Sequence, residues 1–114
     1  MRIMLPLLLA LPIAAAAAAD RHPANDYPTA TRAEYVFACM TANGGTQAAL
    51  QQCSCAIDVI ASILPYRDYQ DAETVLRMRQ LTGGYLAQTF HAETTKRMVH
   101  HLEEAQAEAD VRCF

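Results

Sequence analysis

The chain has 114 residues, with 9 basic and 12 acidic side chains and a formal net charge of −3 at pH 7. This length leaves room for one folded domain. A mildly acidic chain without a basic patch has no electrostatic attraction to nucleic acid, so nucleic acid is excluded as an expected partner. The absence of tryptophan and of long β-branched runs argues against a β-sandwich or barrel.

The first 19 residues have the order of a secretory signal peptide. A positive start at Met1-Arg2 precedes an apolar run over 3–13 and small residues over 14–19. A membrane-spanning helix needs about 20 apolar residues, whereas this run is shorter and contains two prolines. We therefore expect cleavage after Ala19, export to the periplasm or the medium, and no membrane span afterwards. The remaining chain carries 8 basic and 12 acidic side chains, a net charge of −4.

Residues 20–30 contain two prolines and no apolar period, which predicts an extended, mobile leader. The first helix is expected to begin at Thr31, because its hydroxyl and the Glu34 carboxylate can cap each other's free backbone N–H groups. The run Asn-Gly-Gly at 43–45 ends this helix, since glycine readily takes the left-handed conformation. Apolar residues recur along the helix at a spacing of four: Tyr35 with Cys39, and Val36 with Met40.

The second helix has the clearest pattern in the chain. Thr46 can cap it, and Pro65 closes it at about Leu64, because proline lacks a backbone donor and restricts the preceding residue. Apolar residues at steps of three and four predict its buried face: Leu50, Cys53, Ile57, Ile60 and Leu64.

A third helix is expected over about 69–81, capped by Asp68 and ended by the glycine pair 83–84. Glu73 and Arg77 stand at i,i+4 in the favourable order, which predicts an outward ion pair. The residues predicted to face inward are Ala72, Val75, Leu76 and Leu81.

After the glycine pair, Tyr85, Leu86 and Phe90 predict a single short helical turn. A last helix is expected over about 94–112, with a strongly charged outer face. Its apolar face is predicted to hold Met98, Leu102, Ala105, Ala109 and Cys113. The sequence thus predicts an all-α domain over 31–114, a small antiparallel bundle of about four helices.

All four cysteines lie in the exported part, and their even number predicts two structural disulfides in an oxidising compartment. On a helix, Cys53 and Cys55 are about 200° apart, which makes them poor partners for each other. We favour Cys39–Cys53 with Cys55–Cys113, because Cys53 shares the apolar face that should meet the first helix. The crossed pairing is the second choice.

A different interpretation treats Cys53-Ser54-Cys55 as a thiol-redox or soft-metal site, with Cys39 or Cys113 as a third ligand. The spacing lacks the Cys-x-x-Cys of a thioredoxin-type motif, so structural disulfides are favoured.

His100 and His101 stand one turn from Glu104, a spacing that can hold a metal, but the charged residues around them are typical of a solvated face. We expect no metal and no cofactor.

The two serines, Ser54 and Ser62, lack the context of a catalytic nucleophile, so the sequence predicts no enzyme. Aromatic and arginine side chains are favoured at binding surfaces. The candidate interaction surface comprises Tyr66, Arg67, Tyr69, Tyr85 and Phe90.

Three runs, 39–45, 53–61 and 107–114, resemble uncharacterised small exported four-cysteine bacterial proteins that accompany periplasmic quinoprotein alcohol dehydrogenases, which use pyrroloquinoline quinone. The resemblance covers most of residues 33–114 and implies a partner class, with no binding residue to carry over. We therefore expect a periplasmic or secreted protein that acts by protein–protein interaction, as an accessory to a dehydrogenase or respiratory system. The alternative is a thiol-redox or metal-handling protein that uses Cys53 and Cys55.

Overall fold

The structure, a computed structural model, describes residues 25–81 and 83–114. The expected signal peptide and residues 20–24 lie outside this part. The helices are α1 (Thr29–Ala42), α2 (Gln47–Ile63), α3 (Tyr66–Leu81), the short α4 (Gly84–Thr89) and α5 (Glu93–Cys113). The described residues contain no strand, and the predicted all-α fold stapled by two disulfides is confirmed.

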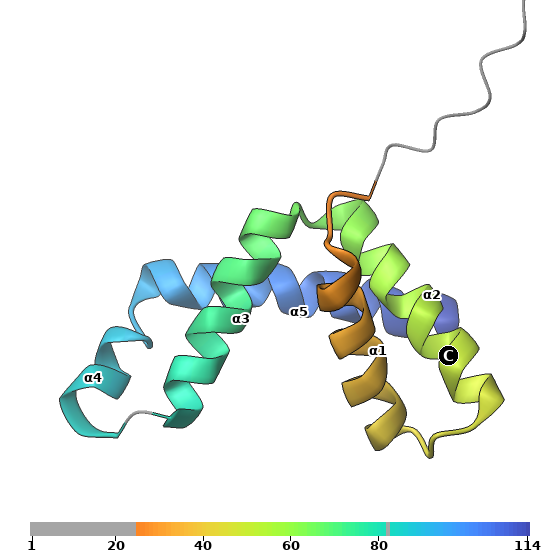
Figure 1. The fold of residues 1–114 in the computed structure, drawn as a ribbon. Helices are drawn as coiled ribbons and strands as arrows, with labels where there is room; N and C mark the ends of the chain where they lie inside the picture. The colour runs from red at the N-terminus through yellow and green to blue at the C-terminus, as the bar shows by residue number, and fades with distance from the viewer. Residues whose placement is uncertain (1–24, 82) are drawn as a thin grey trace, which may run out of the picture.

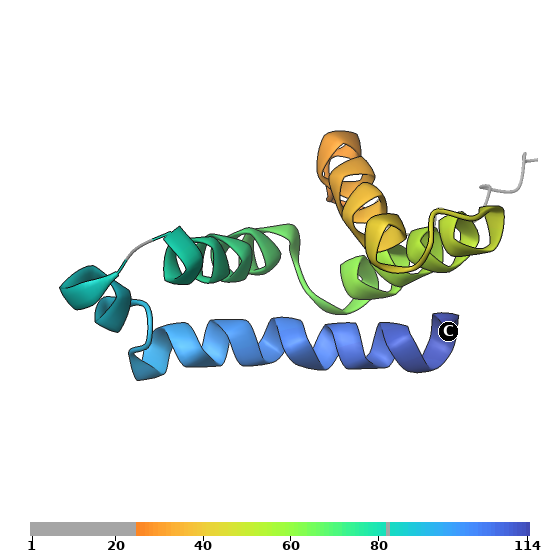
Figure 2. The ribbon, with the colours of Figure 1, turned by 90° about the horizontal axis from the view of Figure 1, so that it is seen from below.

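The long helix α5 runs along one side of the molecule, and both α2 and α3 pack on it (Figure 2). Helix α1 folds back on α2, so the α1–α2 hairpin and α3 form two arms (Figure 1). The arms diverge from a corner at Leu64-Pro65, where α2 and α3 are bent by 112°. In the described chain, no single helix has the length and hydropathy of a membrane span, although α2 and α3 together pass that test across their bend.

The turn between α1 and α2 follows the prediction. Gly44 and Gly45 take φ angles of 90° and 64°, which side chains rarely adopt. The Thr46 hydroxyl accepts a hydrogen bond of 3.0 Å from the Ala49 N–H and so caps α2. Helix α2 ends at Ile63, directly before Leu64 and Pro65.

Helix α1 begins at Thr29, and the predicted capping box of Thr31 and Glu34 is wrong. Pro28 occupies the N-cap position with φ of −57°, and no side chain caps this end. Proline fixes a φ close to the helical value, which suits the start of a helix without help from a side chain. The Thr31 hydroxyl instead lies 3.3 Å from the Tyr66 hydroxyl.

Helix α3 begins at Tyr66, three residues before the predicted start, and Asp68 lies in its first turn rather than at its cap. The Pro65 carbonyl accepts the hydrogen bond of the Tyr69 N–H at 3.1 Å, which starts the helix directly after the proline. The free Tyr66 N–H donates to the Asp26 carboxylate at 3.1 Å, so a residue 40 positions away caps this end.

Leu81 is 73% exposed, so its predicted inward position is wrong. It lies nine positions after the buried Ala72, which is about half a turn away from the buried face on a 3.6-residue helix. The other residues predicted to face inward on α3 are buried or half-buried.

The segment 25–28 packs against the corner, in contrast to the extended leader expected over 20–30. Tyr27 is only 4% exposed, and its hydroxyl donates a 2.7 Å hydrogen bond to the Leu64 carbonyl. Its ring lies 5.3 Å from the Tyr66 ring and 5.0 Å from the Tyr69 ring, measured between centroids. Because Pro65 interrupts the helical hydrogen bonding at this corner, a side-chain hydroxyl from elsewhere in the chain can pair with Leu64.

The core lies where α5 meets the corner and the two arms. Small side chains on α5 allow its backbone to approach α2 closely, since Ala105 and Ala109 are fully buried. The main buried cluster joins these alanines to Tyr27, Ala56, Ile57, Ile60, Leu64, Tyr69, Ala72 and Leu102. The predicted inner faces of α2 and α5 are therefore largely confirmed.

Both favoured disulfides are present. Cys39–Cys53 joins α1 to α2, and Cys55–Cys113 joins α2 to the end of α5. Cys53 and Cys55 thus have separate partners on different helices, as their angular separation on α2 predicts. Two disulfides in so small a domain indicate an oxidising compartment outside the cytoplasm.

We expect the two disulfides to contribute unequally to stability. In the chain-entropy account, closing a 58-residue separation contributes about 4 kcal/mol and a 14-residue separation about 3 kcal/mol. Urea unfolding should therefore show a larger loss for Cys55→Ala/Cys113→Ala than for Cys39→Ala/Cys53→Ala. A larger loss in the variant that lacks the α1–α2 bridge would contradict this order.

We also expect Tyr27→Phe to lower the free energy of unfolding by about 1–3 kcal/mol, because it leaves a buried carbonyl without its hydroxyl donor. Tyr66→Phe is the matched control. The Tyr66 hydroxyl makes a longer contact, 3.3 Å to the Thr31 hydroxyl, in a partly buried place, so its removal should lower the free energy of unfolding by less. Thermal or urea unfolding measures both variants. Equal losses of unfolding free energy would show that the hydrogen bond to the Leu64 carbonyl stabilises the fold no more than the contact of Tyr66 with Thr31.

Candidate functional site

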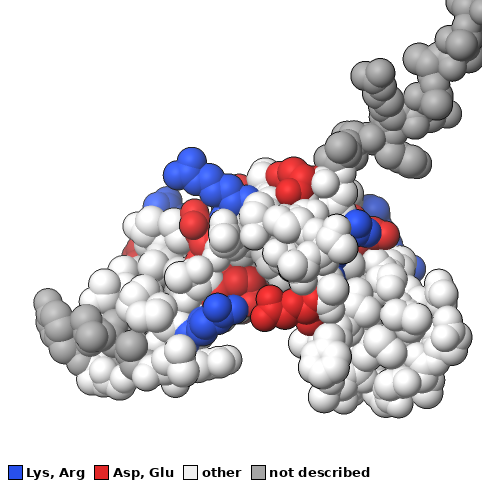
Figure 3. All heavy atoms as spheres, viewed as in Figure 1, with Lys and Arg blue, Asp and Glu red and all other residues white. Residues whose placement is uncertain are grey.

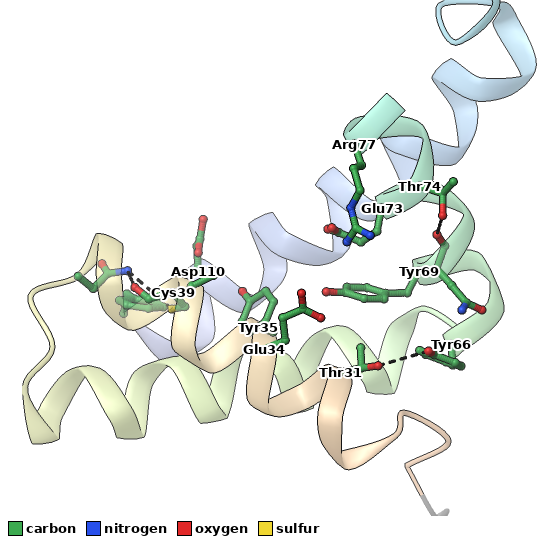
Figure 4. Close-up of a pocket in the computed structure, with 14 residues that line it drawn as sticks. Thr31, Glu34, Tyr35, Cys39, Tyr66, Tyr69, Glu73, Thr74, Arg77 and Asp110 are labelled. Atoms are coloured by element: carbon green, nitrogen blue, oxygen red, sulfur yellow. Dashed lines mark hydrogen bonds between the residues drawn. The ribbon is translucent and has the colours of Figure 1, made fainter. Parts of the chain in front are cut away.

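A cleft of about 770 Å³ lies between the two arms. Helices α1 and α3 form its walls, and residues at the end of α5 close one side (Figure 4). Charged side chains gather in the hollow between the arms (Figure 3). The lining includes four charged side chains and two tyrosines that stand among them: Glu34, Glu73, Arg77, Asp110, Tyr35 and Tyr69.

The backbone explains why these groups meet. Glu34 and Tyr35 are neighbours on α1, and the disulfide through Cys39 fixes this helix against α2. Tyr69 and Glu73 stand one turn apart on α3 and share one face of that helix. The 112° bend between α2 and α3 turns this face toward α1, and the cleft lies between them (Figure 4).

The cleft carries more negative than positive charge. Glu34, Glu73 and Asp110 come from three different helices, whereas Arg77 is the cation in the lining. Burial raises the pKa of the Glu73 carboxyl, Arg77 opposes the rise, and the Glu34 carboxylate adds to it. The two glutamates therefore repel each other across the cleft. Ionisation of the half-buried Glu73 carboxyl is unfavourable compared with ionisation in water.

Two tyrosines stand among these carboxylates. Burial raises the pKa of Tyr35, and the Asp110 and Glu73 carboxylates raise it further. Burial also raises the pKa of Tyr69, with Glu73 as the next cause. Both phenols therefore keep their protons at neutral pH and can donate as well as accept hydrogen bonds.

The Tyr69 hydroxyl is the most informative group in the cleft. The side chain is only 7% exposed, and it points from α3 toward Tyr35 and Glu34 (Figure 4). Its hydroxyl makes no hydrogen bond to any residue in the described part of the chain. The hydroxyl oxygen itself is not one of the fully buried unpaired atoms, so it reaches the open space of the cleft and is a candidate contact for a ligand.

The structure places the predicted interaction residues in different environments. Tyr66 and Tyr69 line the cleft, half-buried and buried respectively, while Arg67 is exposed. Phe90 lies near the other end of α3, where its carbonyl accepts a 2.6 Å hydrogen bond from Arg79. The side chain of Tyr85 lies outside the described part. The cleft therefore brings Tyr66 and Tyr69 together, while Arg67 and Phe90 are not part of its lining.

The other candidate sites do not assemble around a shared centre. Cys53 is fully buried and paired with α1, whereas the half-buried Cys55 is paired with α5. His100 and His101 lie 3.2 and 3.5 Å from the Glu104 carboxylate on an exposed face. Over residues 25–81 and 83–114, no three His, Cys, Asp or Glu side chains are placed to hold a metal ion.

No protein-family model, curated protein or solved structure matches this chain.

Sequence reasoning missed the carboxylates of the cleft. It assigned Glu34 to a helix cap and Glu73 to an outward ion pair, and it gave Asp110 no role. A usable indication was present in the sequence, because each wall pairs a tyrosine with a nearby glutamate: Tyr35 with Glu34, and Tyr69 with Glu73.

The raised pKa of Glu73 predicts that Glu73→Gln stabilises the protein at neutral pH. A carboxyl with a raised folded pKa binds protons more tightly when folded, so its ionisation penalty is fully present above that pKa. The penalty disappears as pH falls toward the ordinary value of 4.5. Thermal midpoints should therefore be higher for the variant at neutral pH and converge with wild type near pH 4.5.

Glu103→Gln, an exposed change on α5, serves as the control and should give no such pH-dependent gain. If Glu73→Gln instead loses stability at neutral pH, the attraction to Arg77 outweighs burial and the account of this carboxyl is wrong.

Proposed function

We propose that this protein is an exported binding protein that acts by contact with another protein and takes a segment of that partner into the cleft between α1 and α3. The observation that carries the proposal is the cleft itself, about 770 Å³ of space lined by aromatic and charged side chains. Binding sites are typically concave and have a few convergent polar groups, as this cleft has.

The walls of the cleft are supported in a way that suits binding. Cys39–Cys53 holds α1, while Cys55–Cys113 ties α2 to the helix beneath both arms. A site whose backbone is already fixed loses little conformational entropy when a partner enters, and this favours affinity. A disulfide-stapled scaffold thus supports recognition by a preformed surface.

The shape of the cleft favours a chain segment as its occupant. Helix α1 has 14 residues, which gives the wall a length of about 20 Å, the span of roughly six extended residues. Phe114, 53% exposed, belongs to the same lining and offers an aromatic contact. Aromatic side chains are enriched where proteins bind each other.

The compartment and the partner class extend this proposal. The disulfides suit the periplasm or the medium, which the signal-peptide pattern of residues 1–19 also favours. The resemblance of the cysteine-bearing runs to proteins that accompany quinoprotein alcohol dehydrogenases favours a periplasmic dehydrogenase or respiratory protein as the partner. We place this protein there as an accessory rather than as an enzyme.

Site-specific photo-crosslinking in the native periplasm tests the proposal. Ala38 is exposed and lines the cleft, whereas Ala107 is exposed on α5 outside the lining. With p-benzoylphenylalanine in place of Ala38, we expect one defined crosslinked protein, identified by mass spectrometry. The same residue in place of Ala107 should yield little of that product.

The crosslink from position 38 should weaken when the cleft variant Glu34→Gln is added. Equal crosslinking from both positions, or no product at position 38, would overturn the proposal that the cleft receives a partner protein.

A further inference from the structure

We propose that the cleft recognises an organic cation, an ammonium or guanidinium group seated among Glu34, Glu73 and Asp110, beside the Tyr35 ring and the Tyr69 hydroxyl. This inference rests on the proposed function for the choice of site, and it adds the chemistry that the site selects. The same chemistry would fit a lysine or arginine side chain of a partner protein or a free organic amine.

The first observation is the convergence of negative charge. Glu34 on α1 acts on Glu73 on α3, and Asp110 on α5 acts together with Glu73 on Tyr35. All three carboxylates, from three helices, line the same cleft. Glu73 is half-buried, whereas Glu34 and Asp110 are exposed, so the attraction for a cation is strengthened by partial desolvation at Glu73.

The second observation is independent of the carboxylates. Tyr69 is more than nine-tenths buried, and its hydroxyl makes no hydrogen bond to a described residue and points into the cleft (Figure 4). A phenol oxygen can accept a hydrogen bond from an ammonium or guanidinium N–H. The Tyr69 ring packs on Tyr27 in the core, whereas the half-buried Tyr35 ring can offer a negative face to a cation.

The arrangement suits an organic cation better than a metal ion. Calcium needs six to eight oxygen ligands at about 2.3–2.6 Å, but residues 25–81 and 83–114 hold no three candidate ligands close enough for a metal. Carboxylates spread along a cleft beside the Tyr35 ring instead fit a larger cation that carries an apolar stem.

Arg77 sets the balance of charge at one end of the cleft. It lies one turn after Glu73 and favours the ionised form of that carboxyl. It also repels a second cation entering from its side. Removal of its charge should therefore strengthen cation binding, which is the opposite of the effect expected for the glutamates.

Isothermal titration of the full disulfide-bonded chain tests the inference with defined probes. An acetylated Gly-Arg-Gly amide supplies the guanidinium, and the same peptide with citrulline supplies a neutral group of nearly the same shape. We expect the arginine peptide to bind at least about tenfold more tightly, the effect of one charge-assisted interaction of about 1.4 kcal/mol. Equal binding of the two peptides would overturn the inference.

Variants assign the binding to the cleft. Tyr69→Phe and Glu34→Gln should each weaken the arginine peptide about five- to tenfold, since each removes a contact to a charged group. Arg77→Gln should tighten it. Glu103→Gln, exposed on α5 outside the cleft, is the control and should leave the affinity unchanged. If this control loses as much affinity as the cleft variants, the peptide is attracted by the overall negative charge of the protein and the inference fails.

Spermidine, as a free amine, separates the two sources of the cation. If both the arginine peptide and spermidine bind in the same variant-dependent way and position 38 crosslinks no protein, the cation inference holds and the proposal of a partner protein fails. If position 38 crosslinks a protein but no cationic probe binds, the proposed function holds and the cation inference fails.

Discussion

The hydrogen bond from the Tyr27 hydroxyl to the Leu64 carbonyl is the interaction on which the shape of this molecule depends. It lies at the corner where Pro65 interrupts the chain between α2 and α3. The neighbouring Asp26 accepts the Tyr66 N–H and caps α3. Two adjacent side chains thus satisfy backbone groups on both sides of one proline, which fixes the direction in which α3 leaves the corner.

The cleft exists because that direction is fixed. If α3 continued the line of α2, Tyr69 and Glu73 would not face α1. The disulfides complete the frame, since one holds α1 against α2 and the other ties α2 to the end of α5. Helix α5 packs beneath both arms (Figure 2). The site is therefore built on backbone constraints, and its side chains meet without a change of fold.

Much of this frame could be predicted from the sequence. Helix geometry excludes a Cys53–Cys55 pair, and the place of Cys53 in the apolar stripe of α2 favours the observed pairing over the crossed one. The Thr46 cap and the glycine turn are local features that need only a few residues to recognise. The inner faces of α2 and α5 follow from periodicity.

The corner and the cleft could not be predicted, because both depend on residues far apart in the chain. Tyr27 bonds to a carbonyl 37 positions away, and nothing in its local sequence distinguishes it from a residue in a leader. Periodicity marks Glu34 and Glu73 only as outward-facing. An outward face becomes the wall of a cleft when another element lies opposite, and that depends on the 112° bend.

A crystal structure of the disulfide-bonded protein grown with arginine amide would test the central claim most directly. The account predicts α1 and α3 at their present separation, with the guanidinium group between Glu34 and Glu73 and the Tyr69 hydroxyl within hydrogen-bonding distance. A guanidinium bound only to the outer carboxylates of α5, or a structure in which α3 has closed onto α1 with nothing between them, would contradict it.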